Sequence, residues 1–174
     1  RDLGPSLSPF NAFQFIQGVE TLPLRFKRHQ SNAVKLAEYL DQHQKILSVT
    51  YPRFFKGNSK VLVNSYLTAG HGALIGIEIK GGVIAGKSFI DNLKLIYHVA
   101  NIGDARTLAI HPASTTHSQL SAEDQIKAGV SPGYVRLSVG LEHIDDIIAD
   151  VEQALRPVSY THLTLPTSFD VLWA

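Results

Sequence analysis

The 174-residue chain has 44% hydrophobic residues, enough for one ordinary core, and it contains no cysteine and no methionine. Its 16 basic and 15 acidic residues exclude the basic excess typical of nucleic-acid-binding proteins, and no apolar run reaches the roughly 20 residues that a bilayer requires. The missing cysteines exclude disulfides and fit a reducing compartment. We therefore expect a cytoplasmic protein with no membrane or nucleic-acid partner. Because the sequence opens at Arg1 without an initiator methionine, we expect it to be a piece of a longer protein.

Two helices are predicted at the N-terminal end. Ser8 is placed to cap a helix that starts at Pro9, and its apolar residues are expected to face the core: Phe10, Phe13, Phe15 and Ile16. A longer helix follows from about Thr21, with apolar positions that step by three and four residues: Leu22, Phe26, His29, Ala33, Leu36 and Leu40. The length of this second helix suits a connection between two domains.

The rest of the chain mixes strands with helices. Strands are predicted at residues 46–51, 73–79, 96–100, 107–110 and 134–139. Helices are predicted at residues 59–66, 83–93, 121–128 and 143–155. This order predicts an α/β layer (an α+β sandwich) in which a mixed, mostly antiparallel sheet carries helices on one face. The other face would then meet a different domain.

Arg136 lies in the most densely patterned stretch. In the run Tyr134-Val135-Arg136-Leu137-Ser138-Val139, apolar residues alternate with Arg136 and Ser138, so a strand places Arg136 opposite the buried face. An arginine there either meets water or is aimed at an anion. Periodicity alone favours the solvated face.

Three segments carry a resemblance to a known family: HPASTTHSQL at 111–120, SPG at 131–133 and VRLSVGLEHIDDIIADVEQAL at 135–155. Together they resemble the C-terminal signature of the pyridoxal-phosphate (PLP) enzymes of cysteine and methionine metabolism, most closely the O-acetylhomoserine sulfhydrylases. The resemblance implies the small C-terminal domain of an aspartate-aminotransferase-like PLP enzyme. Residues 1–43 would be the end of the large PLP domain and the long linking helix, and residues 44–157 the small domain.

The same resemblance implies the roles of four residues. Arg136 would bind the α-carboxylate of the amino-acid substrate, and Asn101 and Thr116 would line the substrate pocket. Ala100 stands where the lyases of the family carry glutamate, and the absence of that carboxylate suits a small nucleophile such as sulfide. The lysine that binds PLP lies upstream in this family, so no catalytic, cofactor-binding or metal-binding residue is assigned in this chain.

For the complete protein, the resemblance implies a homotetrameric transferase of methionine biosynthesis. It would convert O-acetyl-L-homoserine and sulfide to L-homocysteine and acetate by γ-replacement, and the fragment alone would be inactive. Methionine γ-lyase, cystathionine γ-synthase and β-lyase chemistry are alternatives within the class. An alternative of another class is a non-catalytic fragment whose uncovered sheet face docks a partner domain.

Other chemistry-bearing patterns are weaker. His111 and His117 lie six residues apart across a turn without a partner carboxylate, which does not match a metal site. The sequence has no G-x-S-x-G nucleophile elbow, so the serines and threonines near His117 are interpreted as loop hydroxyls. After Pro157 the helical period fails, and residues 158–174 are predicted to be a non-native, disordered tail.

Overall fold

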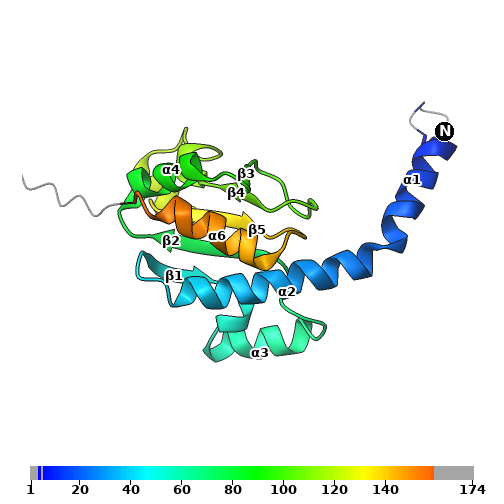
Figure 1. The fold of residues 1–174 in the computed structure, drawn as a ribbon, viewed down its shortest axis with the longest axis horizontal. Helices are drawn as coiled ribbons and strands as arrows, with labels where there is room; N and C mark the ends of the chain where they lie inside the picture. Colours follow the sequence, from blue (N-terminus) through cyan, green and yellow to red (C-terminus); the bar gives the residue numbers. More distant parts are fainter. Residues whose placement is uncertain (1–3, 5, 159–174) are drawn as a thin grey trace, which may run out of the picture.

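The computed structural model describes residues 4 and 6–158, which form six α-helices and five strands (Figure 1). In chain order these elements are α1 (Pro9–Glu20), α2 (Leu22–Asp41), β1 (Ile46–Thr50), α3 (Gly57–Tyr66), β2 (Leu74–Ile79), α4 (Gly82–Asn92), β3 (Tyr97–His98), β4 (Leu108–Ile110), α5 (Ala122–Lys127), β5 (Tyr134–Ser138) and α6 (Ile144–Leu155). Short 3₁₀ turns lie at Pro52–Phe54 and Pro112–Ser114. Among the described residues, no helix is both long and apolar enough to cross a bilayer.

The five strands form one sheet in the order β1-β2-β5-β4-β3. All neighbours are antiparallel except β3 and β4, which run parallel. The predicted mixed, mostly antiparallel sheet is therefore confirmed. Strand β5 lies in the middle, with β2 on one side and β4 on the other, so its side chains have sheet neighbours in both directions.

One face of the sheet is covered by a layer of helices. Figure 1 shows α2, α6 and α4 in this layer, and α6 contacts both of the others. The sheet residues that point into it are fully buried, as their alternation predicted: Ile75, Ile77, Ile79, Val135 and Leu137. Helix α6 adds Ile147, Val151 and Leu155 to the same core. Hydrophobic burial between these two layers is the main force that holds the domain together.

Helix α1 lies apart from the two layers (Figure 1). Its start agrees with the sequence, because the Ser8 hydroxyl accepts a hydrogen bond from the Asn11 N–H at 3.2 Å. The prediction that its apolar side chains face the core is wrong. All are exposed, by 67% at Phe10, 58% at Phe13, 65% at Phe15 and 58% at Ile16. The period identifies an apolar side of a helix, but the described residues place nothing against that side.

Helix α2 changes from exposed to buried along its length. Its first two predicted core positions, Leu22 and Phe26, are exposed, whereas the row is buried from His29 onwards. The change falls where α2 reaches the end of β5. There the Asn32 side chain donates to the carbonyl oxygens of Gly140 at 3.0 Å and Glu142 at 2.9 Å. One half of α2 therefore belongs to the domain, and the other half extends out of it.

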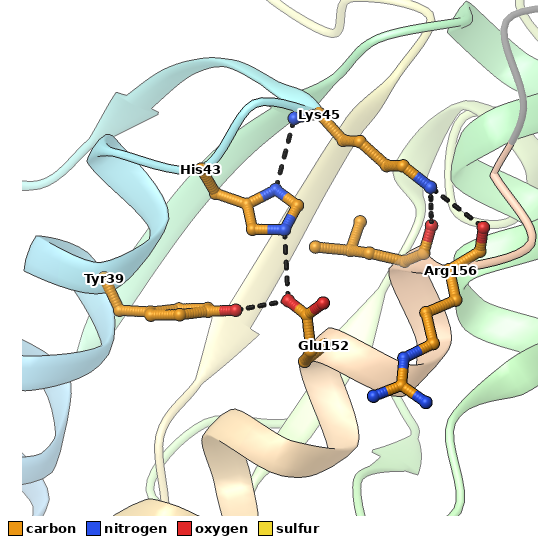
Figure 2. Close-up of polar contacts among 6 residues, drawn as sticks. Tyr39, His43, Lys45, Glu152 and Arg156 are labelled. Atoms are coloured by element: carbon orange, nitrogen blue, oxygen red, sulfur yellow. Dashed lines mark hydrogen bonds and ion pairs between the residues drawn. The ribbon is translucent and has the colours of Figure 1, made fainter.

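A polar cluster joins the far end of α2 to α6 (Figure 2). The Tyr39 hydroxyl donates to the Glu152 carboxylate, and His43 Nε2 lies 3.1 Å from the same oxygen. Next to it, Lys45 Nζ donates to the carbonyl oxygens of Leu155 and Arg156, each at 2.8 Å. These contacts satisfy the last carbonyls of α6, which have no partner within the helix.

Smaller differences concern element ends. Strand β3 contains only two residues of the predicted 96–100, because its partner β4 is three residues long. Helix α3 begins at Gly57, two residues before the predicted start. Of the predicted tail, Val158 is buried against the core, and residues 159–174 lie outside the described part of the chain.

Candidate functional site

Arg136 lies on the face of the sheet opposite the helices. Its neighbours along β5, Val135 and Leu137, are fully buried on the helix side, and Arg136 itself is half-buried. Its nearest sheet partners are Gly76 on β2 and Ile110 on β4. A central strand with neighbours on both sides therefore fixes the backbone of this arginine.

The guanidinium of Arg136 has one protein partner of note. Its Nη2 donates to the backbone carbonyl oxygen of Asn101 at 3.3 Å. None of the five ion pairs among the described residues involves Arg136. Since a guanidinium carries five N–H donors, most of them remain free for an external acceptor. A carboxylate is the acceptor that best matches this planar fork of donors.

Tyr134 lies beside Arg136 on the same face. A side chain at Gly76 would overlap the Tyr134 ring, so this glycine leaves room for the ring to lie across β2. Burial raises the pKa of the Tyr134 hydroxyl, while the nearby charge of Arg136 opposes that rise. The acidic residue closest in register, Glu78, is held away from Arg136 by the Ser131 hydroxyl and by the Gly133 N–H at 2.9 Å.

Asn101 reaches the site through its backbone. Its side-chain Oδ1 accepts from the N–H of Ile102 at 2.9 Å, and its carbonyl oxygen faces Arg136. Two residues later, the Gly103 N–H donates to the hydroxyl of the buried Ser138 at 3.2 Å. The loop between β3 and β4 therefore folds over the open face of β5. Ala100, the predicted specificity position, is exposed at the start of this loop.

Thr116 lies on a different loop, after the 3₁₀ turn Pro112–Ser114. It is exposed, and its hydroxyl lies 2.9 Å from His117 Nδ1. No hydrogen bond joins it to Arg136 or Asn101 among the described residues. Of the three predicted pocket residues, Arg136 and Asn101 are thus joined by a hydrogen bond, whereas Thr116 bonds to its own neighbour His117.

His111 is fully buried beneath the Thr116 loop. Its Nε2 lies 2.8 Å from the Pro132 carbonyl oxygen, and its Nδ1 lies 2.8 Å from the Ser114 hydroxyl. The carbonyl can only accept, so Nε2 carries the proton. A side chain at Gly86 on α4 would overlap this ring. Both ring nitrogens are occupied, which makes His111 a structural residue.

A pocket of about 320 Å³ adjoins the β3–β4 loop that contacts Arg136. Ile102, Gly103 and Ser138 form one side, and most of the remaining wall is apolar. His29 also lines it, with Nδ1 at 2.6 Å from the Val139 carbonyl oxygen. The helical period predicts His29 in the apolar row of α2, but it gives no signal for a hydrogen-bond partner that lies 110 residues away.

The ionisable side chains that line this pocket are those of His29 and His71. No lysine lines this pocket. Lys45 is bound to the end of α6, Lys80 Nζ to the Gln44 carbonyl, and Lys127 pairs with Asp124. The open face of the sheet therefore carries the Arg136 cation and, beside it, a largely apolar pocket.

The sequence matches the family model for Cys/Met metabolism PLP-dependent enzymes over residues 1–156. It is 58% identical over 159 residues to an O-acetyl-L-homoserine sulfhydrylase of Leptospira meyeri, covering 91% of this chain and 36% of that protein. It is 48% identical over 155 residues to a homocysteine synthase of Schizosaccharomyces pombe, covering 89% and 36%. The chain therefore spans about a third of the length of these curated relatives.

The fold is similar to that of a solved structure described as an O-acetylhomoserine (thiol)-lyase from Campylobacter jejuni. The TM-score is 0.79 with 43% identity, over 89% of this chain and 37% of that one. That protein carries a pyridoxyl-lysine monophosphate group. The similarity covers both layers of the present fold.

Proposed function

The chain belongs to the family of Cys/Met metabolism PLP-dependent enzymes, and from that premise we propose that it is the C-terminal part of an O-acetylhomoserine sulfhydrylase. The complete enzyme converts O-acetyl-L-homoserine and sulfide to L-homocysteine and acetate. The names of the relatives at 58% and 48% identity support this reaction. Because the chain spans about a third of their length, the activity is assigned to the full-length protein and not to these residues alone.

In this proposal Arg136 holds the α-carboxylate of the amino-acid substrate. The observation that carries it is a half-buried guanidinium on the open face of a central strand, with a backbone carbonyl as its protein partner. PLP, bound by the upstream region, supplies the electron sink for the carbon chemistry. This chain contributes orientation, because a bidentate grip on the carboxylate fixes the direction of the remaining substrate bonds.

The test is substitution of Arg136 in the full-length enzyme. Arg136→Ala should lower kcat/KM for O-acetylhomoserine by at least about 30-fold, because truncating one partner of a hydrogen-bonded charge pair costs about 2–5 kcal/mol. Arg136→Lys should give an intermediate kcat/KM, since lysine keeps the positive charge but lacks the two parallel N–H donors. Arg53→Ala is the matched control, because Arg53 is exposed and, among the described residues, forms its ion pair with Glu38 on α2. An effect of Arg136→Ala within about threefold would refute the role.

The choice of sulfide as nucleophile rests on Ala100. This residue is exposed and adjoins Asn101, whose carbonyl contacts Arg136. Introducing Ala100→Glu would add a carboxylate that can pair with a second amino group. We expect the variant to gain activity on larger amine-bearing substrates such as cystathionine relative to sulfide transfer. Unchanged relative rates in a product assay would remove Ala100 as a specificity residue.

The alternatives of the same class use the same scaffold. Methionine γ-lyase, cystathionine γ-synthase and β-lyase reactions are distinguished from sulfhydrylation by assays with sulfide, with cysteine and with no added nucleophile. Homocysteine formation only with sulfide supports the proposal. Ketoacid release without a nucleophile would favour a lyase.

The apolar side of α1 supports a domain arrangement in which residues 1–43 pack against an upstream PLP-binding domain and residues 44–157 form the small domain. Four large apolar side chains of α1 are more than half exposed in this chain. A surface of this kind commonly marks an interaction site.

We further propose a cytoplasmic homotetramer, and light scattering of the full-length enzyme tests the assembly. A monomer would contradict it.

A further inference from the structure

The loop from Val99 to Arg106 joins the edge strand β3 to its neighbour β4 and carries the Asn101 carbonyl. Its base is fixed on both sides. The Val99 N–H donates to the Ala109 carbonyl at 3.2 Å, and the Thr107 N–H donates to the Glu142 carboxylate at 2.6 Å. Between these anchors lies Gly103, with a left-handed φ of 79°. The segment that contacts Arg136 is therefore held at both ends and turns at a glycine in its centre.

Two side chains stack across the base of this loop. The Arg106 guanidinium carbon lies 4.4 Å from the centroid of the Tyr97 ring, within range of a cation–π interaction. Asp104 sits on the same arginine, with Oδ1 at 3.6 Å from Nε, and the same oxygen accepts the Arg106 N–H at 3.0 Å. That backbone hydrogen bond lowers the pKa of the Asp104 carboxyl. We call these three residues the loop clasp.

The loop clasp lies on the same face of the sheet as Arg136. Tyr97 is the register partner of Leu108, and Leu108 is the partner of Ser138, two residues along β5 from Arg136. Partners in register point to the same face. From the clasp the loop reaches β5 twice, through the Gly103 N–H to Ser138 Oγ and through the Asn101 carbonyl to Arg136 Nη2.

Stability alone does not account for the loop clasp. Tyr97 is 53% exposed and Arg106 is exposed as well. Exposed ion pairs add little to the free energy of folding, because water screens them. A stacked arginine paired with an aspartate does, however, restrict the conformation of a short loop that turns at Gly103. Its effect reaches β5 through the contacts of the loop with Ser138 and Arg136, and the contact with Arg136 is the one that bears on the proposed binding of a carboxylate.

We propose that Tyr97, Arg106 and Asp104 are positioning residues for substrate recognition. They hold the loop so that the Asn101 carbonyl fixes one end of the Arg136 guanidinium, and the remaining N–H donors keep the direction that a substrate carboxylate needs. This inference rests on the proposed role of Arg136. None of the three residues contacts the substrate itself.

The experiment compares KM and kcat of variants of the full-length enzyme. Arg106→Gln and Tyr97→Leu should each raise KM for O-acetylhomoserine about two- to fivefold, the range expected for one exposed cation–π contact. The kcat at saturation and the KM for sulfide should stay unchanged. Tyr97→Phe keeps the ring and should retain the parent KM. Lys87→Gln, at an exposed position on α4, is the matched loss-of-charge control.

An Arg136→Lys background separates positioning from general loosening of the fold. If the loop clasp acts through Arg136, Arg106→Gln should change KM by less than about 1.5-fold in that background. The inference is overturned if Arg106→Gln leaves KM unchanged in the parent enzyme, if it raises both KM values alike, or if its effect persists in the Arg136→Lys background. A parent-like KM for Arg136→Lys and Arg136→Ala would instead overturn the proposed function, and the inference with it.

Discussion

At the scale of single residues, Glu152 shows how one carboxylate can tie two helices together. Its Oε2 accepts the Tyr39 hydroxyl and lies 3.1 Å from His43 Nε2 (Figure 2). His43 Nδ1 accepts the Lys45 N–H at 3.2 Å, which leaves the ring proton on Nε2, facing Glu152. The hydrogen bond from Tyr39, followed by that from His43, lowers the pKa of Glu152. Burial and the same Glu152 raise the pKa of Tyr39 to about 12.

This pattern predicts how stability depends on pH. The folded-state pKa of Glu152 lies below its unfolded value, so its contribution is present above the ordinary glutamate pKa of about 4.3 and is lost as the pH falls below it. Glu152→Gln should therefore lower the free energy of unfolding at pH 7, and the gap to the parent should narrow towards pH 3. Urea unfolding across this range measures it, with Glu123→Gln as the exposed control. A gap that is constant with pH would contradict the prediction.

At the scale of elements, Asp150 links α6 to the connection between α4 and β3. This buried carboxylate accepts three backbone N–H groups, from Lys94 at 2.9 Å, Leu95 at 3.0 Å and Ile96 at 2.9 Å. The carboxylate supplies the acceptors that these three backbone N–H groups do not find within the turn. The polar side chain on the buried side of α6 thereby fixes where β3 begins.

Removal of the Asp150 carboxylate should be costly. Asp150→Ala leaves three backbone donors without their acceptor, and we expect a loss of about 3 kcal/mol in the free energy of unfolding. Asp150→Asn should cost less, because its amide keeps one acceptor oxygen. Chemical denaturation measures the loss for both variants, with Asp91→Asn at an exposed position of α4 as the control. A loss below about 1 kcal/mol for the alanine variant would show that water can take over these donors.

These elements also show what a sequence can and cannot predict. Alternation predicted that Ile75, Ile77 and Leu137 point into the core and that Arg136 points away, because side-chain direction depends only on local backbone geometry. It could not predict the Asn101 carbonyl as a partner of Arg136. That contact spans 35 residues and depends on how a loop folds back. The resemblance supplied Asn101 as a pocket residue, but only coordinates distinguish its carbonyl from its side chain.

At the scale of the whole molecule, α1 is the main departure from expectation. Its apolar residues recur at helical spacing, less regularly than those of α6. Phe10, Phe13 and Ile16 are nevertheless exposed, while the apolar side of α6 is buried. Amphipathicity predicts that an apolar side will be covered without stating which part of a protein covers it. A stripe read from a piece of sequence can thus belong to an interface with residues outside that piece.

The exposed side of α1 predicts the behaviour of the isolated chain. We expect concentration-dependent self-association and binding of an apolar dye, because contiguous exposed apolar surface associates in water. Replacing Phe13 and Ile16 together by lysine should reduce both. Ile84→Lys, at a position on α4 that is 76% exposed, should not. Sedimentation velocity across a range of concentrations measures the effect, and equal association of all three proteins would contradict it.

The continuity of α2 has a mechanical result. Helix α2 has twenty residues and is about 30 Å long. From Asn32 onwards it is fixed to the domain, whereas Leu22 and Phe26 near its start are exposed. A domain that packs against Phe26 would therefore be held in a fixed orientation relative to β5, because one unbroken helix connects the two. The proposed substrate site beside Arg136 would thus keep a constant orientation relative to any domain that packs against the start of α2.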